Sequence, residues 1–331
     1  MLPIGKVPNN ILKDVVFKYL GVKSENVIDG PHVAGDSAII KVGNRNYIAL
    51  KTDPITGAVK NIGRHAIIIN SNDIISRGAI PKYFMATILL PPKSSIDDLK
   101  EICMDLHNAS LELNISIIGG HSEVTDVVSS PVIIGQMIGE IDEDNLLDAR
   151  NIDVGDQIIL TKSVGIEGCS IIAHDHYNLI ENLIEEDMIK KAKNLIDQIS
   201  VYEEGLIARK IGGVKFMHDP TEGGLIGGLI ELCEFINKGF IIYEDKIPIY
   251  PEVEMICKAL EIGPLRLLGR GALIIICERD SSKELIDKIK TKNVNADIIG
   301  EIIGSKFKIV KKNGNTLELS NETYEELWRK V

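Results

Sequence analysis

The chain has 331 residues, 44% of them apolar and 26% charged, so it is long enough for two domains and too balanced in composition to be disordered. Its formal net charge of −11 at pH 7 argues against a general nucleic-acid-binding protein, which would carry a basic face. The N-terminal segment MLPIGKVPNN has no apolar signal region, and no apolar run approaches the roughly 18 residues of a membrane span. We therefore expect a cytoplasmic protein without membrane association.

The five cysteines lie far apart, and none has the close spacing of a zinc knuckle or a redox pair. We interpret them as reduced thiols in the protein core, as is usual in the cytoplasm. They are Cys103, Cys169, Cys233, Cys257 and Cys277.

The first half of the chain mixes a hairpin with helices and further strands. Hydrophobic patterning and turn residues predict the order ββαβαββ after an N-terminal amphipathic helix. The helices are expected at 10–20, 62–77 and 96–113, and the strands at 36–42, 47–53, 83–90, 115–118 (a buried strand, ISII) and 131–141.

The acidic stretch 142–153 is the best domain boundary, which gives an N-terminal domain of residues 1–150 and a C-terminal domain of residues 151–331. The second half contains the strand ALIIIC, a hairpin turned at Asn313-Gly314 and a short helix over 321–330. Both halves combine hairpins with helices, so the pattern predicts α+β domains and not one doubly wound sheet.

The predicted hairpin places two acids opposite each other. If its loop is centred between Asn44 and Arg45, then Val42 faces Tyr47 and Asp36 faces Asp53. Facing carboxylates repel, and Mg²⁺ would remove that cost because it prefers one or two carboxylates together with phosphate oxygens. The alternative is that both acids are solvated at frayed strand ends.

The helix over 62–77 is interrupted by four polar residues, Asn70 to Asp73. Asn and Asp are poor residues for a helix interior because their side chains compete for backbone hydrogen bonds. Asn70, Asp73 and Arg77 share one face of the helix. Either this face is a solvent-facing stripe, or it carries Asp73 as a third acid near a metal.

Two glycine-rich segments could approach an anion. In IIGGHSEV, Gly119-Gly120 follows a strand and could expose N–H groups to a ligand, while His121 and Glu123 could be contacts or ordinary turn residues. The loop KSVGIEG (162–168) could be a similar cradle between a strand and a helix.

In KFMHDPTEGGLIGG, local rules predict a helix that starts with Asp219 as N-cap, Pro220 at N1 and Glu222 at N3. Four glycines would then cost the helix roughly 3–4 kcal/mol relative to alanine. They permit either close helix–sheet packing or the approach of a phosphate to the helix N-terminus. These are Gly223, Gly224, Gly227 and Gly228.

Taken in order, the motifs AGDSAII, KTDP, NSNDIISRGAIP, IIGGHSEV, ILTKSVGIEG and HDPTEGGL resemble the PurM-like superfamily over roughly Gly5 to Glu301. This superfamily includes aminoimidazole-ribonucleotide (AIR) synthetase, the hydrogenase maturation factor HypE, thiamine-monophosphate kinase and selenophosphate synthetase. The sequence is most similar to archaeal HypE-like proteins. The resemblance implies a two-domain fold whose N-terminal sheets join into a barrel in a homodimer, with a C-terminal α/β sandwich domain.

The resemblance also implies the cofactors ATP and Mg²⁺. Asp36, Asp53 and Asp73 match the acids that hold the metal and the phosphates in the family. The other positions that match nucleotide contacts are Ser37, Asn72, Gly119, Gly120 and His121.

The loop HDPTEGGL matches the family loop that faces the reaction centre, so the resemblance implies that His218, Asp219 and Glu222 handle the acceptor. HypE usually has Arg where Glu222 stands.

Two departures narrow the expected activity. HypE carries its substrate on a C-terminal cysteine, whereas this sequence ends ELWRKV and its last cysteine is Cys277; selenophosphate synthetases need a reactive thiol near the N-terminus, whereas the first cysteine is Cys103. We therefore expect an enzyme that uses ATP and Mg²⁺ to phosphorylate or activate an oxygen of a small-molecule or protein-borne acceptor and releases ADP. The alternatives are a small-molecule kinase resembling thiamine-monophosphate kinase and a non-catalytic nucleotide-binding partner in a maturation complex.

Overall fold

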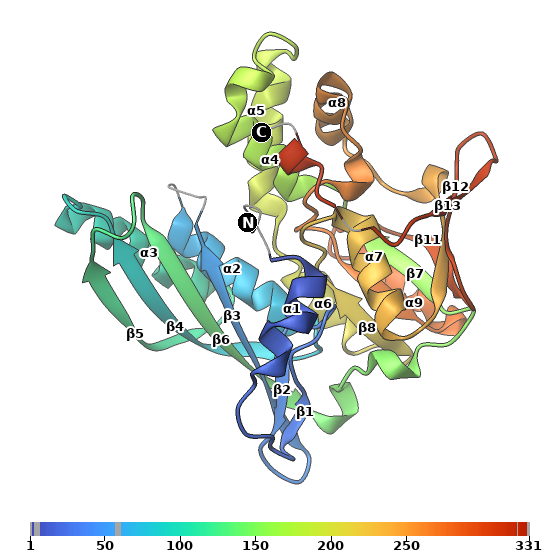
Figure 1. Ribbon diagram of the computed structural model, residues 1–331, viewed down its shortest axis with the longest axis horizontal. Coiled ribbons are helices and arrows are strands. Elements are labelled where there is room, and N and C mark those ends of the chain that lie inside the picture. Colours follow the sequence, from blue (N-terminus) through green and yellow to red (C-terminus); the bar gives the residue numbers. More distant parts are fainter. Residues whose placement is uncertain (1, 3–6, 57–60, 323, 330–331) are drawn as a thin grey trace. The chain divides into compact units, whose positions relative to one another are not determined.

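The computed structural model describes every residue except 1, 3–6, 57–60, 323 and 330–331 (Figure 1). The chain forms two compact units. Residues 22–31 and 35–146 form one, which we call the six-stranded unit after its sheet, and residues 1–21, 32–34 and 147–331 form the other, the seven-stranded unit. The N-terminal residues thus belong to the same unit as the second half of the chain.

The six-stranded unit is a mixed sheet in the order β1-β2-β3-β6-β4-β5, with the pair β4–β5 parallel and the other pairs antiparallel. This α+β organisation confirms the predicted fold class, with one more short strand, β1, than predicted. The elements are β1 (Val27–Asp29), β2 (Ala38–Lys41), β3 (Asn46–Ile55), α2 (Ile62–Ile75), β4 (Ile80–Leu90), α3 (Ile96–Glu112), β5 (Ser116–Val124) and β6 (Val132–Asp142).

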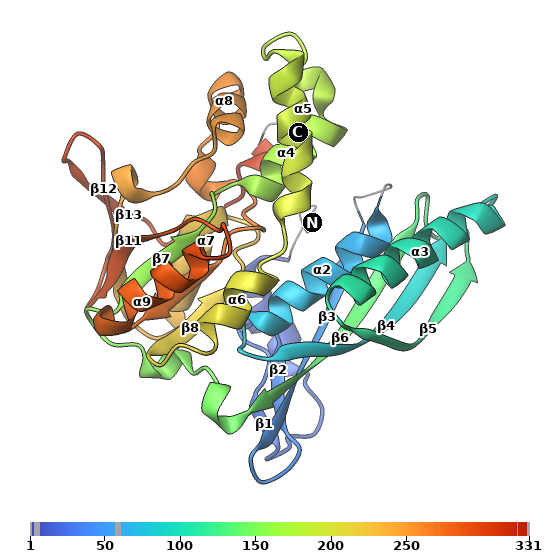
Figure 2. The ribbon, with the colours of Figure 1, turned by 180° about the vertical axis from the view of Figure 1, so that it is seen from behind.

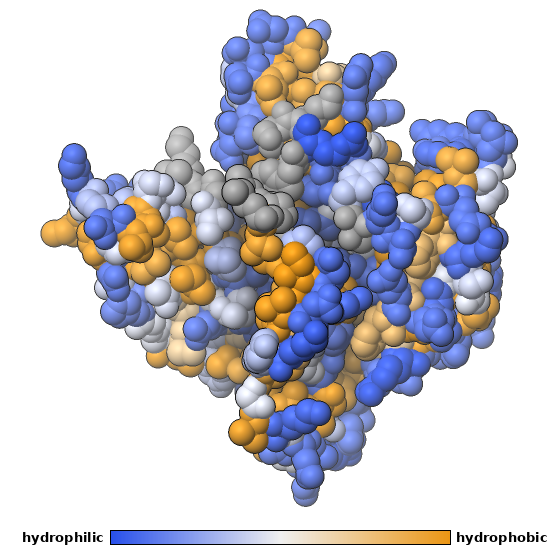
Figure 3. Space-filling view, viewed as in Figure 1, coloured by the Kyte–Doolittle hydropathy of each residue, from blue (hydrophilic) through white to orange (hydrophobic). Residues whose placement is uncertain are grey.

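Both long helices of this unit cover the same face of the sheet, as Figure 2 shows. On β4 the burial alternates, with Phe84 and Ile88 buried, because successive strand residues point to opposite faces. The opposite face carries half-exposed apolar side chains such as Leu50 and Ile134, and Figure 3 shows apolar surface gathered over this part of the sheet.

The register of the hairpin differs by one residue from the prediction. Lys41 pairs with Tyr47, so the connecting loop has an odd number of residues and is centred on Asn44. β2 begins only at Ala38, and Asp53 faces Gly135 of β6. The predicted pairing of Asp36 with Asp53 is therefore wrong, because a one-residue change of register moves every partner.

Strand β5 is exposed at all nine residues, so the prediction of a buried ISII strand is wrong for its β5 part, in which Ile118 is 54% exposed. The reason is its place at the edge of the sheet, where it pairs with β4. Gly119-Gly120 lies within this strand and not in a turn, just after an irregularity in the register. At Gly120 a side chain would collide with the Ala86 carbonyl oxygen, 2.1 Å from the Cβ position.

The seven-stranded unit has the strand order β13-β12-β9-β11-β7-β10-β8, and its core lies between this sheet and α7. Its strands are β7 (Gln157–Thr161), β8 (Val214–His218), β9 (Gly239–Tyr243), β10 (Ile274–Cys277), β11 (Ala296–Ile303), β12 (Phe307–Val310) and β13 (Thr316–Leu319). Its helices are α1 (Asn9–Asp14), α4 (Ile166–Asp175), α5 (Glu186–Asn194), α6 (Tyr202–Ala208), α7 (Gly224–Phe235), α8 (Pro251–Leu260) and α9 (Arg279–Lys290).

Two helices near the ends of the chain are shorter than predicted. The helix expected over 10–20 ends at Asp14 and continues as the 3₁₀ turn Val16–Lys18, because the adjacent β-branched residues Val15 and Val16 disfavour helix. In place of a helix over 321–330, the described residues form only the 3₁₀ turn Leu327–Arg329.

Four of the five cysteines are buried and Cys103 is exposed, so the prediction of core thiols is wrong for Cys103 alone. Burial raises the pKa of Cys233, Cys257 and Cys277 to about 12, which keeps these thiols protonated. In the part of the chain that the structure describes, no helix is long and apolar enough to cross a membrane.

Candidate functional site

The polar run of α2 is buried. Asn70, Ser71 and Asn72 are fully buried and Asp73 is 4% exposed, so the alternative of a solvent-facing stripe is wrong. Two of these side chains donate back to the helix itself: Asn70 Nδ2 to the Ala66 carbonyl at 2.9 Å, and Ser71 Oγ to the carbonyl one turn before it at 2.6 Å. Burying four polar side chains in succession is costly unless each is satisfied, so this run indicates a polar site.

The run faces the sheet where β3 and β6 pair. A Cβ atom at Gly135 would lie 2.3 Å from Asn70 Nδ2, so the helix approaches the strand through the missing side chain. Gly135 is the cross-strand partner of Asp53. The fold thus brings the polar run of α2 next to the part of β3 that carries Asp53.

Lys51 joins two of the predicted acids. Its Nζ atom lies 3.2 Å from Asp73 Oδ2 and 3.8 Å from Asp53 Oδ1. The side chains of Lys51 and Asp53 are about one fifth exposed, while that of Asp73 is 5% exposed. We did not predict Lys51 from the sequence. The alternation of strand residues carried the signal, because positions 51 and 53 must share a face.

Asp36 and Ser37 directly precede β2 and are 8% and 7% exposed. Because Ala38 pairs with Leu50, both residues enter the sheet from the end of β3 that carries Lys51. Ser37 Oγ and Asn70 Oδ1 are buried and have no hydrogen-bond partner among the described residues. Such atoms call for a ligand or a water molecule.

The remaining predicted nucleotide contacts lie on β5 of the same unit. His121 Nε2 lies 3.2 Å from Glu123 Oε2, and both side chains are about half exposed or more. Figure 1 shows β5 at the outer edge of the sheet. These residues are therefore accessible to a ligand from solvent.

The residues of this site fit a divalent cation with an attached polyanion. Mg²⁺ binds oxygen ligands and uses few protein carboxylates, and here Asp53 and Asp73 already share one cationic group. Among the described residues no three His, Cys, Asp or Glu side chains gather as a ready-made metal cage. Such a site would need the phosphate oxygens of a nucleotide to complete the coordination.

The segment HDPTEGGLIGG starts its helix later than predicted. Helix α7 begins at Gly224 with Gly223 as N-cap, so the predicted capping by Asp219, with Pro220 at N1 and Glu222 at N3, is wrong. Asp219 follows β8 directly and is 1% exposed, and His218 at the end of β8 is 6% exposed.

Packing explains the glycines of α7. Gly223 and Gly224 have φ of +79° and +58°, which L-residues rarely adopt. A Cβ atom at Gly224 would lie 2.6 Å from the Leu267 carbonyl oxygen, and one at Gly228 would lie 2.9 Å from the His218 ring. Close packing, one of the two alternatives considered for these glycines, thus accounts for these positions.

The second glycine cradle considered from the sequence, KSVGIEG, has the same explanation. Gly165 is the N-cap of α4 with φ +68°, and a Cβ atom at Gly168 would lie 2.6 Å from Leu267 Cγ. Lys162, in the same loop, is buried and lies 2.7 Å from Glu204, so its charge is used inside the protein.

A carboxylate from the C-terminal segment occupies the start of α7. Glu325 accepts hydrogen bonds from the backbone N–H groups of Gly223 (2.7 Å), Leu268 (3.0 Å) and Leu327 (2.9 Å). Burial raises the pKa of Glu325 to about 7, with a further contribution from the Glu222 carboxylate, while the three N–H donors act in the opposite direction. No sequence pattern pointed to the contact of Glu325 with the start of α7, because Gly223 and Glu325 lie 102 residues apart.

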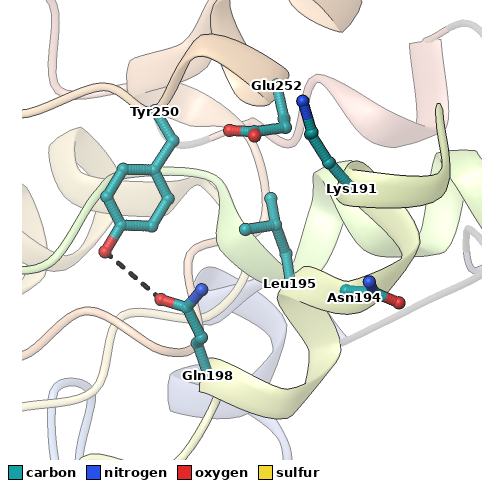
Figure 4. A pocket seen from close by; sticks show the side chains of 6 residues that line it. All are labelled: Lys191, Asn194, Leu195, Gln198, Tyr250 and Glu252. Atoms are coloured by element: carbon teal, nitrogen blue, oxygen red, sulfur yellow. Dashed lines mark hydrogen bonds between the residues drawn. The ribbon is translucent and has the colours of Figure 1, made fainter. Parts of the chain in front are cut away.

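The seven-stranded unit also has an open surface cavity of about 360 Å³ between the end of α5 and the start of α8 (Figure 4). Tyr250 donates a hydrogen bond to Gln198 Oε1 across it at 3.3 Å. Its other lining residues are Lys191, Asn194, Leu195 and Glu252, so none of the residues predicted to bind nucleotide or acceptor contributes to it.

Comparison with protein families gives two matches along the chain. Residues 34–141 match the N-terminal domain of AIR synthase related proteins, and residues 153–312 match the C-terminal domain of the same family. The first range contains Asp36, Asp53 and Asp73, and the second contains HDPTEGGL.

Two relatives show the level of similarity. A protein of Methanocaldococcus jannaschii named for hydrogenase expression and formation is 30% identical over 302 residues, which is 89% of this chain and 88% of the relative. The carbamoyl dehydratase HypE of Bradyrhizobium diazoefficiens is 27% identical over 259 residues, which is 76% of this chain and 71% of the relative.

Solved structures show the same fold at lower identity. HypE in a HypE–HypF complex superposes with a TM-score of 0.77 at 22% identity, covering 94% of this chain and 99% of the other. HypE in complex with ATP gives 0.74 at 20% identity and covers 100% and 98%. The protein ThiL complexed with AMPPCP and TMP gives 0.73 at 16% identity and covers 96% and 98%. The two family matches and the relative that is 30% identical show that the chain belongs to the AIR synthase-related, PurM-like family that includes the hydrogenase maturation protein HypE.

Proposed function

We propose that the protein is an ATP- and Mg²⁺-dependent enzyme that phosphorylates or activates an oxygen atom of a small-molecule or protein-borne acceptor and releases ADP. The observation that carries the proposal is the site around Lys51, where Asp53 and Asp73 gather on one cationic group inside the region that matches the family. The solved structures of HypE with ATP and of ThiL with AMPPCP support a nucleotide as the ligand.

In this proposal the acids of the six-stranded unit hold the cation. Asp53 and Asp73 supply carboxylate oxygens, and Asp36 adds a third acid from the segment before β2. When bound, the metal would neutralise charge that develops on the transferring phosphoryl group. Ser37 and Asn72 would contact the nucleotide together with the strand residues Gly119, Gly120 and His121.

We place the acceptor at residues 218–222, between the end of β8 and the start of α7. His218, Asp219 and Glu222 remain our candidates for orienting the acceptor or moving its proton, by their position in the family loop. His218 and Asp219 are buried, whereas Glu222 is half-buried and thus the most accessible of the three. General acid–base catalysis requires such a group within hydrogen-bond reach of the acceptor.

The relatives differ in the acceptor that their names and complexes suggest, which is either carried by a protein or a small molecule. HypE relatives are named carbamoyl dehydratases, and a HypE–HypF complex has been solved, which favours a protein-borne acceptor. The likeness to ThiL with TMP keeps a small-molecule kinase as the second candidate.

We also propose that the protein forms a homodimer through the six-stranded unit. All nine residues of β5 are exposed, including Ile118 and Val124 at 54% and 62%, and the sheet face away from α2 is apolar. Exposed apolar strands at a sheet edge invite pairing with a second chain. The variant Ile118→Asp should shift the mass measured by light scattering from dimer to monomer. A wild-type protein that is monomeric at micromolar concentration would contradict this proposal.

The function is tested by nucleotide binding and turnover. Calorimetry with Mg²⁺ and the non-hydrolysable analogue AMPPCP should show binding to the wild type and a loss of at least about tenfold for Asp53→Asn, because a charged metal ligand becomes neutral. Asp144→Asn, at an exposed carboxylate of the same unit, is the matched control and should bind as the wild type does. ADP release should appear with Mg²⁺ and the correct acceptor, and extracts of the source cell supply candidates.

Absence of nucleotide binding by the wild type would exclude both the enzyme and the non-catalytic nucleotide-binding partner. Binding that never leads to ADP release, with any acceptor or extract, would favour the partner role.

A further inference from the structure

Lys51 holds a position that a metal ion would also take. Its ammonium group lies within 4 Å of one oxygen of Asp53 and one of Asp73. This contact lowers the repulsion between the two carboxylates, and the cost of burying Asp73 is partly offset by a charged partner. The lysine therefore supplies positive charge at the oxygens where a bound cation would also supply it.

An ammonium group and a divalent cation cannot both remain at these oxygens without strong repulsion, because two positive charges would lie within a few ångströms in a partly buried site. A cation that binds Asp53 and Asp73 must displace Lys51 Nζ or share the acids at a reduced affinity.

The lysine side chain can move out of the site. It is 21% exposed, and its four-carbon stem has several rotatable bonds. Phosphate oxygens next to the metal would be the natural new partner, since an ammonium group binds phosphate as a point charge. Rotation of the side chain would thus move the Lys51 ammonium group from the two carboxylates to a polyphosphate.

We propose that Lys51 is a built-in counter-ion of this site, which occupies the cation position in the free protein and moves to the phosphates when the metal and the nucleotide bind. The inference rests on the proposed function. It explains how two acids stay together before the metal arrives, and it couples metal entry to nucleotide entry, since the displaced ammonium gains a new anionic partner only when a polyphosphate is present.

The first arm of the test uses Mg²⁺ alone, without nucleotide. In Lys51→Met the competing charge is gone, so Mg²⁺ should bind roughly tenfold more tightly by calorimetry than to the wild type. The melting temperature without divalent ion should fall, and added Mg²⁺ should raise it more than in the wild type. Lys51→Gln, which keeps a hydrogen-bond donor, should show the same tightening if Lys51→Met is poorly folded.

The controls separate charge from shape. Lys51→Arg keeps the cation and should leave Mg²⁺ affinity within about twofold of the wild type. Lys82→Met removes a lysine from β4 of the same sheet and should change neither Mg²⁺ affinity nor the response of the melting temperature.

The second arm adds AMPPCP at saturating Mg²⁺, where Lys51→Met should bind roughly tenfold more weakly than the wild type because a phosphate contact is lost. Unchanged or weaker Mg²⁺ binding by both neutral variants would overturn the counter-ion role, and unchanged AMPPCP affinity would overturn the move to the phosphates. Either result leaves the proposed function standing if the wild type binds Mg²⁺ and AMPPCP, whereas failure of the wild type itself removes the proposed function.

Discussion

Helices α2 and α7 both contain residues that a helix should avoid, yet the structure accommodates them in different ways. Helix α2 buries Asn70, Asn72 and Asp73 in its middle, and its charge is met by a lysine from the sheet. Helix α7 places four glycines in and just before its first two turns, and each site has backbone or a ring where a side chain would be. Helix α2 thus has polar side chains where apolar ones are expected, and α7 has no side chains where neighbouring atoms leave no room.

A buried polar side chain and a buried glycine call for different interpretations. A buried polar side chain carries a cost that only partners can offset, so it points to chemistry at that position. A buried glycine has a complete explanation when backbone conformation or a neighbouring atom requires it. By this criterion α2 marks the site in its own right, whereas the glycines of α7 need no ligand to account for them.

The largest effect is expected for Gly224→Ala in α7. Alanine at φ +58° costs about 1–2 kcal/mol. The clash with the Leu267 carbonyl adds about 1–3 kcal/mol, so the free energy of unfolding should fall by about 2–5 kcal/mol in total. Gly155→Ala is the matched control. Its φ is also positive, at +96°, but a Cβ atom there meets no atom of the described residues within 4 Å, so it should lose only about 1–2 kcal/mol.

Denaturant unfolding measures both variants. Equal losses in Gly224→Ala and Gly155→Ala would show that packing does not account for Gly224, and the ligand interpretation of the α7 glycines would return.

The next largest change in the free energy of unfolding is expected when the pH is varied, because Glu325 at the start of α7 gains or loses a proton. Its pKa rises from an ordinary value of 4.5 to about 7 on folding, so between these values the folded protein holds a proton that the unfolded chain has lost. Stability from this group is therefore present at about pH 4.5 and decreases as the pH rises to about 7, by up to about 3 kcal/mol.

The comparison of the wild type with Glu325→Gln isolates this group, because glutamine does not titrate. The stability of the wild type relative to the variant should decline between pH 4.5 and pH 7.5 in urea unfolding. A relative stability that rises with pH would mean that the three N–H donors outweigh burial.

The smallest change in stability is expected for Asp73→Asn in α2. The side chain keeps its size and Lys51 keeps Asp53, so the loss should be about 1 kcal/mol, while the rise in melting temperature on addition of Mg²⁺ and AMPPCP should disappear. Gly228→Ala in α7 is the opposite control, because it should reduce stability through the His218 ring and leave the ligand response intact.

If Gly228→Ala also abolished that response, or if Asp73→Asn kept it, the distinction drawn between the two helices would fail.

Much of the six-stranded unit was predictable, because its hairpin, its two helices and its long strands follow from hydrophobic periodicity and turn residues. The pairing of Asp36 with Asp53 failed because periodicity cannot count the residues of a loop, and one residue sufficed to change every partner. Lys51 was missed because a lysine in a strand reads as a solvated residue until the acid of a helix, Asp73, is brought beside it.

The predicted start of α7 was wrong for a related reason. Asp219, Pro220 and Glu222 satisfy the local rules for a helix start, but positive φ at Gly223 and Gly224 and the carboxylate of Glu325 set the start four residues later than N1 was expected. Contacts across about 100 residues override local preferences, and no local pattern records them.

The division of the chain has a consequence for the order in which it folds. The six-stranded unit is an insertion, since residues 22–31 and 35–146 lie between segments of the seven-stranded unit. Asn9 of α1 donates a hydrogen bond to Glu231, 222 residues later, and Glu325 completes the start of α7. During synthesis the inserted unit can close while the ribosome is still at work, but the seven-stranded unit must wait for its last segment. Its first helix, α1, lacks its contact with Glu231 of α7 for most of translation. During this period the nascent chain most needs protection from aggregation.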